Sequence, residues 1–241
     1  MRARSTFRRS FATLSSQAVR GVQAKERNVA VLLHGLLGSK GNLQTFAKKL
    51  SVALPMWTIH LVDLRGHGDS ARLDLVEGAN TLARCCEDLD ELFASLRIRP
   101  SVVAGHSFGG KVALQYATTC NRPLQVWTLD SWPGTMGSSD TDQVLRALRN
   151  TALPIQKKTD LVPFLESQGI SKQIGMWMTT NLAESRPGKP ICPKLRHCLG
   201  LRWTTILDSY MQVLGSSGGS IWTLWRSCSP TIRAPIDQRH G

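Results

Sequence analysis

Short apolar runs alternate with amphipathic stretches along the first half of the chain. Each run is apolar at consecutive positions, as a strand buried on both faces requires. The segments between the runs carry apolar residues at the 3–4 spacing of a helix with one buried stripe, most clearly from Leu82 to Leu96. Strands that alternate with helices demand a parallel sheet with right-handed crossovers. We therefore predict an α/β fold, a mostly parallel sheet flanked by helices, with strands at 29–33, 57–62, 102–104 and 126–129.

The alternation stops after Gly134, and three short amphipathic helices are predicted at 141–150, 160–168 and 171–182. The pattern fits a lid over the sheet edge and a plain helical subdomain without a gating role equally well. No apolar strand pair follows, so the last strands of the sheet are expected to be missing or irregular. The predicted organisation is a presequence, a core, a helical lid and a divergent tail, at 1–25, 26–135, 136–190 and 191–241.

The formal charge of +13 is concentrated at the two ends of the chain, which are poor in acidic residues. A basic excess confined to the ends does not form a nucleic-acid groove, so nucleic-acid binding is excluded. The first segment is rich in Arg and Ser and lacks acids, which is typical of an organellar transit peptide. This predicts a mitochondrial or plastid location, and otherwise a cytoplasmic one; a disordered basic arm is the alternative.

No window contains the roughly 18 uninterrupted apolar residues that a membrane span needs. The six cysteines show neither metal-ligand spacing nor the pattern of a disulfide-rich domain, so we expect reduced thiols and no metal site. The oligomeric state leaves no signal in the sequence.

The run Gly105-His106-Ser107-Phe108-Gly109-Gly110 follows an apolar strand and opens a helix. In this context a Gly-x-Ser-x-Gly sequence indicates a nucleophile elbow, in which Ser107 occupies a strained turn and its hydroxyl is exposed. Gly105 and Gly109 would remove side chains that collide at the turn, and His106 lies beside the serine. A serine that merely caps the helix is the alternative.

A hydroxyl nucleophile also needs donors for the oxyanion that forms on attack. The amide of Phe108 lies at a helix N-terminus and is one predicted donor. The loop after the first strand, which begins His34-Gly35-Leu36, would supply the other through the amide of Leu36. His34 and Gly35 also fit a strand-ending turn in which His34 bonds to backbone, and both interpretations can hold.

Three segments carry a family resemblance: residues 34–39, 61–70 and 105–111. With the Met178-Thr179-Thr180-Asn181-Leu182 run, they make the chain from about residue 28 to 182 resemble the α/β-hydrolase superfamily. Within it the chain is similar to a branch of small acyl esterases with mitochondrial and bacterial members. The resemblance implies hydrolysis of a small acyl ester or thioester through a serine nucleophile, with no cofactor.

A serine hydrolase needs an acid that orients a histidine base. Asp130 follows the fourth strand and is the predicted acid, although it equally fits a turn-capping aspartate. One polar loop contains Asp63, Arg65, His67 and Asp69. We predict that these side chains form a network that stabilises the loop, with His67 hydrogen-bonded to backbone.

The base is not identifiable. His197 and His240 follow the serine and the acid in the required order, but neither has the sequence context that the family shows. We infer that residues from about 190 onward come from a truncated, alternatively spliced or mispredicted reading frame. Losing the base alone costs several powers of ten in rate. The alternative function is therefore an inactive hydrolase-fold binding protein or a truncated isoform.

Overall fold

The structure is a computed structural model of the 241-residue chain. It describes residues 13–72, 81–119, 123, 125–131, 143–144, 146–148, 157–184 and 191–193. Its centre is a sheet of five strands in the order β1-β3-β2-β4-β5. All neighbours run parallel except β1, which is antiparallel to β3. The strands are β1 (Ser16–Arg20), β2 (Val29–Leu33), β3 (Thr58–Val62), β4 (Val102–His106) and β5 (Gln125–Leu129). The predicted α/β fold with a mostly parallel sheet is confirmed.

Strand β1 changes the predicted start of the core. It pairs with β3 along its whole length, from Ser16 opposite Val62 to Arg20 opposite Thr58. Leu14, just before it, is buried in the main core. The predicted presequence of residues 1–25 therefore overlaps a strand, because the backbone groups of residues 16–20 belong to the sheet. The basic composition hid a strand whose residues are exposed or half-buried and which is held by pairing with β3.

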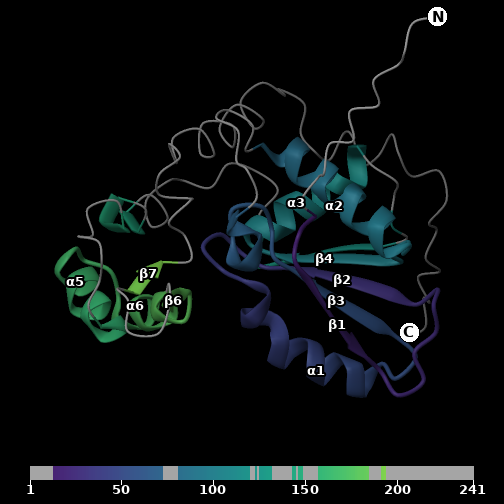
Figure 1. Cartoon of the computed structure of the whole chain (residues 1–241), viewed down its shortest axis with the longest axis horizontal. Helices are drawn as coiled ribbons and strands as arrows, with labels where there is room; N and C mark the ends of the chain where they lie inside the picture. Colours follow the sequence, from purple (N-terminus) through teal and green to yellow (C-terminus); the bar gives the residue numbers. More distant parts are fainter. Residues whose placement is uncertain are drawn as a thin grey trace, which may run out of the picture.

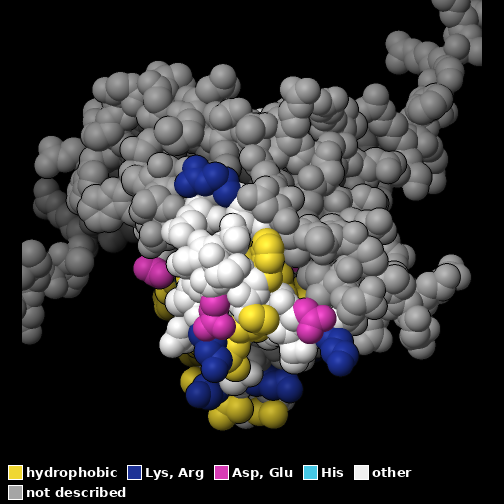
Figure 2. Space-filling view, turned by 90° about the vertical axis from the view of Figure 1, so that its left-hand side faces the viewer, with side chains coloured by type: hydrophobic (Ala, Val, Ile, Leu, Met, Phe, Trp, Pro, Cys, Tyr) yellow, Lys and Arg dark blue, Asp and Glu magenta, His cyan; other side chains and the backbone are white. Residues whose placement is uncertain are grey.

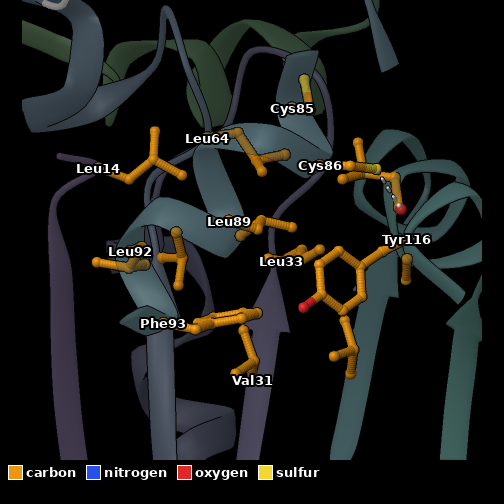
Figure 3. Close-up of a cluster of buried hydrophobic side chains, with 14 of the residues drawn as sticks. Leu14, Val31, Leu33, Leu64, Cys85, Cys86, Leu89, Leu92, Phe93 and Tyr116 are labelled. Atoms are coloured by element: carbon orange, nitrogen blue, oxygen red, sulfur yellow. Dashed lines mark hydrogen bonds between the residues drawn. The ribbon is translucent and has the colours of Figure 1, made fainter. Parts of the chain in front are cut away.

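Helices cover both faces of the sheet (Figure 1). Helix α1 (Gln44–Ala53) lies on one face, and α2 (Leu82–Leu96) and α3 (Phe108–Thr119) lie on the other. The predicted stripe of α2 is buried except at Leu96, which is exposed, and it forms the main core together with one face of the strands. Figure 3 shows this core, where the rings of Phe93 and Tyr116 meet edge to face at 5.7 Å. The Tyr116 hydroxyl donates to Asp90 at 2.8 Å, which ties α3 to α2.

Asn42 lies in a helical turn that precedes α1. A 3₁₀ turn, η1 (Lys40–Leu43), precedes α1, and Ser39 stands at its N-cap. The Asn42 side chain accepts a hydrogen bond from the Ser39 amide at 2.7 Å. Asn42 is thus the N3 residue of a capping box, in which its side chain accepts a hydrogen bond from the backbone of the N-cap residue.

The second part of the chain contains α5 (Leu161–Ser167) and α6 (Lys172–Thr179), as predicted. A small antiparallel sheet of β6 (Leu182–Glu184) and β7 (Ile191–Pro193) follows, which the sequence pattern did not indicate. Two further 3₁₀ turns are η2 (Gly68–Arg72) and η3 (Lys158–Asp160). In the predicted first helix, the described residues 143–144 and 146–148 are helical. Residues 194–241, most of the predicted tail, lie outside the described residues.

Residues of this second part form their own hydrophobic cluster, which also includes Leu37 from the loop after β2. Met178 and Leu182 are buried there, whereas Trp177 is exposed. Figure 2 shows hydrophobic side chains lying among Lys, Arg and acidic side chains on this side of the molecule. Within the described residues, no helix has the length and hydrophobicity to cross a membrane.

Candidate active site

Ser107 lies at a sharp turn between the end of β4 and the start of α3. Its φ of 50° is in the left-handed region, which is strained for a residue with a side chain. Its amide donates to the carbonyl of Leu129 on β5 at 2.9 Å, and its carbonyl accepts from Gly110 at 3.0 Å. These bonds anchor the turn to the sheet on one side and to the helix on the other. The structure shows the predicted strand–turn–helix placement of Ser107.

The two glycines of the motif have no room for side chains. A Cβ on Gly105 would lie 2.0 Å from the carbonyl oxygen of Gly109, and a Cβ on Gly109 would lie 2.5 Å from that of Leu33. Both distances are far inside van der Waals contact. The close approach lets the first turn of α3 lie against the end of β2. The elbow and the loop after β2 are therefore neighbours.

The loop after β2 lies directly beside the serine. A Cβ on Gly35 would be 3.4 Å from the Cβ of Ser107 and 2.8 Å from Nδ1 of His106. The predicted donors Leu36 and Phe108 come from this loop and from the first residue of α3. No described residue accepts a hydrogen bond from the Leu36 amide. The structure thus brings together the predicted nucleophile and the two segments predicted to hold the oxyanion.

His34 is buried, with 1% of its side chain exposed. Its Nδ1 donates to the carbonyl of Gly35 at 2.8 Å, and its Nε2 accepts from the Leu64 amide at 3.1 Å. Burial, together with the nearby His67, lowers the pKa of His34 to about 3. Its predicted backbone role is confirmed, and both ring nitrogens are occupied.

His67 is bound in the same way. Its Nδ1 donates to the carbonyl of Arg65 at 2.8 Å, and its Nε2 accepts from the Leu37 amide at 3.2 Å. Burial also lowers the pKa of this imidazole. The prediction that His67 bonds to backbone is confirmed, and neither His34 nor His67 has a free nitrogen to act as a base.

Asp63 organises the loop that follows β3. Its carboxylate accepts from the Lys40 amide and from the Lys40 ammonium, both at 2.6 Å, and from the Asp69 amide at 2.9 Å. The ammonium also donates to Asp69 at 2.6 Å and to Ser15 at 2.9 Å. Although burial alone would lower it, these carboxylates raise the pKa of Lys40. Sequence reasoning missed Lys40 and Ser15, because their contribution requires β1 and the loop after β2 to meet.

A buried ion pair fixes the same loop to α2. Arg65 donates to the Asp88 carboxylate from Nε at 2.6 Å and from Nη2 at 3.0 Å. This bidentate geometry holds the guanidinium in one orientation. The loop that carries His67 is therefore rigidly placed relative to both the sheet and α2.

Asp130 follows β5 with a φ of 48°, and its side chain is 94% exposed. Its Oδ2 lies 3.8 Å from Nε2 of His106, whose side chain is 48% exposed. Among the described residues, His106 is the only histidine at ion-pair distance from Asp130. The structure thus places the predicted acid at the same sheet edge as Ser107. His197 and His240 lie outside the described residues.

The two buried histidines predict acid sensitivity. Their pKa values lie below the ordinary 6.5 in the folded chain, so the unfolded chain binds more protons as the pH falls below that value. The stability from these neutral imidazoles is complete above about pH 6.5 and is lost as the pH falls toward 3 for His34. Each extra proton bound by the unfolded chain makes the free energy of unfolding fall by about 1.4 kcal/mol more per pH unit of acidification. We expect urea midpoints measured from pH 7 to pH 4 to fall, and to fall less steeply in His34→Gln; an unchanged slope in this variant would contradict the assignment.

Comparisons with known proteins agree with this geometry. The sequence model of the alpha/beta hydrolase family matches residues 30–234. The sn-1-specific diacylglycerol lipase ABHD11 of Mus musculus is 32% identical over 163 residues, 64% of this chain and 51% of that protein. Its Xenopus laevis counterpart is 39% identical over 87 residues, 36% of this chain and 26% of that protein. The chain thus spans about a quarter to a half of the length of these relatives.

Solved structures show the same fold at low sequence identity. A marine microorganism esterase superposes with a TM-score of 0.67 at 20% identity, covering 80% of this chain and 72% of that one. E-2-(acetamidomethylene)succinate hydrolase gives a TM-score of 0.58 at 16% identity, covering 77% and 66%. With a mostly parallel sheet, a serine at the elbow and a family match over residues 30–234, this chain belongs to the α/β-hydrolase family.

Proposed function

We propose that this chain is a serine hydrolase of carboxylic esters or thioesters. The observation that carries the proposal is the position and conformation of Ser107. Its φ is 50°, and it lies on a turn next to Gly35 of the loop after β2. A left-handed serine is costly and persists where the surrounding structure imposes it, which is typical of catalytic sites. A serine that served only as a helix cap would not need this conformation.

The chemistry follows from the neighbours of Ser107. The hydroxyl attacks the acyl carbonyl carbon, and the amides of Leu36 and Phe108 donate to the oxygen that becomes negative. Collapse of this intermediate expels the alcohol or thiol and leaves an ester on Ser107, which water then hydrolyses. Asp130 is the proposed acid, and the base has to be a histidine other than His34 and His67. His197 and His240 are the candidates that chain order allows.

The substrate class rests on the relatives. The name of the ABHD11 proteins describes an sn-1-specific diacylglycerol lipase. For the present chain we propose a small acyl ester or thioester, with the helical region around α5 and α6 as a lid. Leu36 and Leu37 pack against that region, so a movement of the lid would reach the oxyanion loop directly.

One observation favours a second function. Asp130 is almost fully exposed and has no described partner except the exposed His106. An acid held this loosely does not orient a base, which fits a hydrolase-fold protein that binds an acyl compound without turnover. Chemical labelling of the serine separates the two functions.

The basic N-terminal segment supports import into a mitochondrion or plastid as a further part of the proposal. Strand β1 limits where a presequence could end. Removal of residues past Leu14 would take away a buried core residue and then the edge strand of the sheet.

Reaction with a fluorophosphonate probe tests the enzyme proposal. An activated serine is phosphonylated rapidly, whereas an ordinary hydroxyl is not. We expect the intact chain to be labelled, the label to map by mass spectrometry to the peptide with Ser107, and p-nitrophenyl acetate to be hydrolysed. Folded protein that is unlabelled would remove the enzyme proposal. Labelling without turnover of esters or thioesters would support the binding function.

A further inference from the structure

His34 and His67 brace each other's loops. His34, at the end of β2, accepts a hydrogen bond from Leu64, in the loop after β3. His67, in the loop after β3, accepts one from Leu37, in the loop after β2. Their ring centroids are 5.0 Å apart. Each histidine therefore holds the backbone of the segment that carries the other, and the two loops form one crossed unit.

The crossed unit holds Leu37, a residue with a strained backbone in the loop after β2 that carries the proposed oxyanion donor Leu36. Leu37 has a φ of 63°, in the left-handed region that is unfavourable for a residue with a Cβ. Two attachments offset this cost: the amide bonds to His67 and the side chain is buried in the cluster of α5 and α6. The Leu37 amide is held by His67, and the preceding amide of Leu36 has no acceptor within the described part of the chain.

We propose that His67 is a positioning residue that keeps the Leu36 amide directed at the reaction centre by holding the Leu37 amide. The proposal rests on the hydrolase function proposed above. His67 does not touch the substrate; it acts through the loop. Its ring also stacks on Phe108, with centroids 6.3 Å apart, so it contacts both segments that supply oxyanion donors.

The hydrogen bonds require a neutral His67 with its proton on Nδ1. Nε2 accepts from an amide, and a protonated ring would turn that nitrogen into a donor facing another donor. The charged and titratable groups near the pair are Asp63, 4.0 Å from Nε2 of His34, Lys40, which neutralises Asp63, and Arg65, whose carbonyl accepts from His67. Burial lowers the pKa of both imidazoles and outweighs the nearby Asp63 carboxylate, which acts in the opposite direction.

Two substitutions separate the two hydrogen bonds of His67. In His67→Gln the carboxamide oxygen can reach the position of Nε2 and accept from Leu37. In His67→Asn the shorter carboxamide can replace only Nδ1 and donate to Arg65. His60→Asn is the matched control, because His60 is also a buried histidine but lies in the middle of β3.

We expect His67→Asn to lower the second-order rate of fluorophosphonate labelling by about 10²-fold per folded molecule, since a misplaced oxyanion donor costs this much. His67→Gln should lose much less, about threefold or below, and His60→Asn should change only thermal stability. A purely structural role would lower the melting temperature in Asn and Gln alike and leave the labelling rate of folded protein unchanged, which would overturn the proposal.

An NMR measurement that does not depend on catalytic activity keeps this test separate from the hydrolase proposal. In ¹⁵N-labelled protein, His67 should be the neutral Nδ1–H tautomer at pH 7, and His67→Asn should shift the amide resonances of Leu36 and Leu37 while His67→Gln restores them. If wild-type protein is unlabelled by the probe, the hydrolase function fails, and these resonances alone decide the role of His67. A charged or Nε2–H imidazole, or unshifted amides in His67→Asn, refutes it.

Discussion

Replacing Ser107 with alanine is expected to abolish fluorophosphonate labelling and ester hydrolysis, with a rate loss of at least about 10³-fold. The reason is chemical: without the hydroxyl no covalent intermediate forms, and only binding and oxyanion stabilisation remain. The fold should be intact, because the Ser107 backbone makes the anchoring bonds to Leu129 and Gly110. Labelling and urea unfolding measured on the same preparation test both statements.

Two matched variants sharpen this test. Ser51→Ala removes a hydroxyl that donates to the Lys48 carbonyl in its own helix, α1, and should leave labelling unchanged. Ser107→Gly should also abolish labelling but raise the free energy of unfolding by about 1 kcal/mol, since glycine adopts a positive φ without strain. An unfolding free energy below that of the wild type in Ser107→Gly would mean that the serine conformation is not strained.

Replacing Gly105 with alanine is expected to give the largest structural effect. The new Cβ would lie 2.0 Å from the carbonyl oxygen of Gly109 and 2.4 Å from the amide of Gly110. These are backbone atoms of the first turn of α3, so no side chain can move aside. The turn has to open or α3 has to shift away from the sheet. We expect a loss of about 3 kcal/mol or more in the free energy of unfolding, the upper end for overpacked sites, and loss of labelling.

Gly41→Ala is the control for Gly105→Ala. Its nearest neighbour would be the Ser39 hydroxyl at 3.5 Å, an ordinary contact, so a methyl group fits there. This variant should keep the wild-type labelling rate and change the unfolding midpoint little. Equal destabilisation by the two alanines would show that the effect of Gly105→Ala is not due to the close approach at the elbow.

Much of the fold could be predicted from local patterns. The apolar runs of β2 and β3 and the helical stripe of α2 indicate their own burial, since a strand buried on both faces and an amphipathic helix have different periods. The elbow was also visible, because a glycine-flanked serine between a strand and a helix is typical of that turn. Strand β1 was not visible. Its residues alternate little, and only pairing with β3 makes Ser16–Arg20 a strand.

The candidate site also has a part that the sequence predicts and a part that only the folded structure shows. The nucleophile, the strand that presents it and the loop that faces it are readable in the amino-acid order, because each is a short contiguous motif with a local conformational requirement. The folded chain was needed to show that His34 and His67 hold each other's loops, that Lys40 neutralises Asp63, and that Asp130 is exposed beside His106. Those relations join residues from different strand ends, and their pairing depends on the order of strands in the sheet. Sequence spacing does not encode that order, whereas hydrogen-bond geometry and burial in the folded chain do.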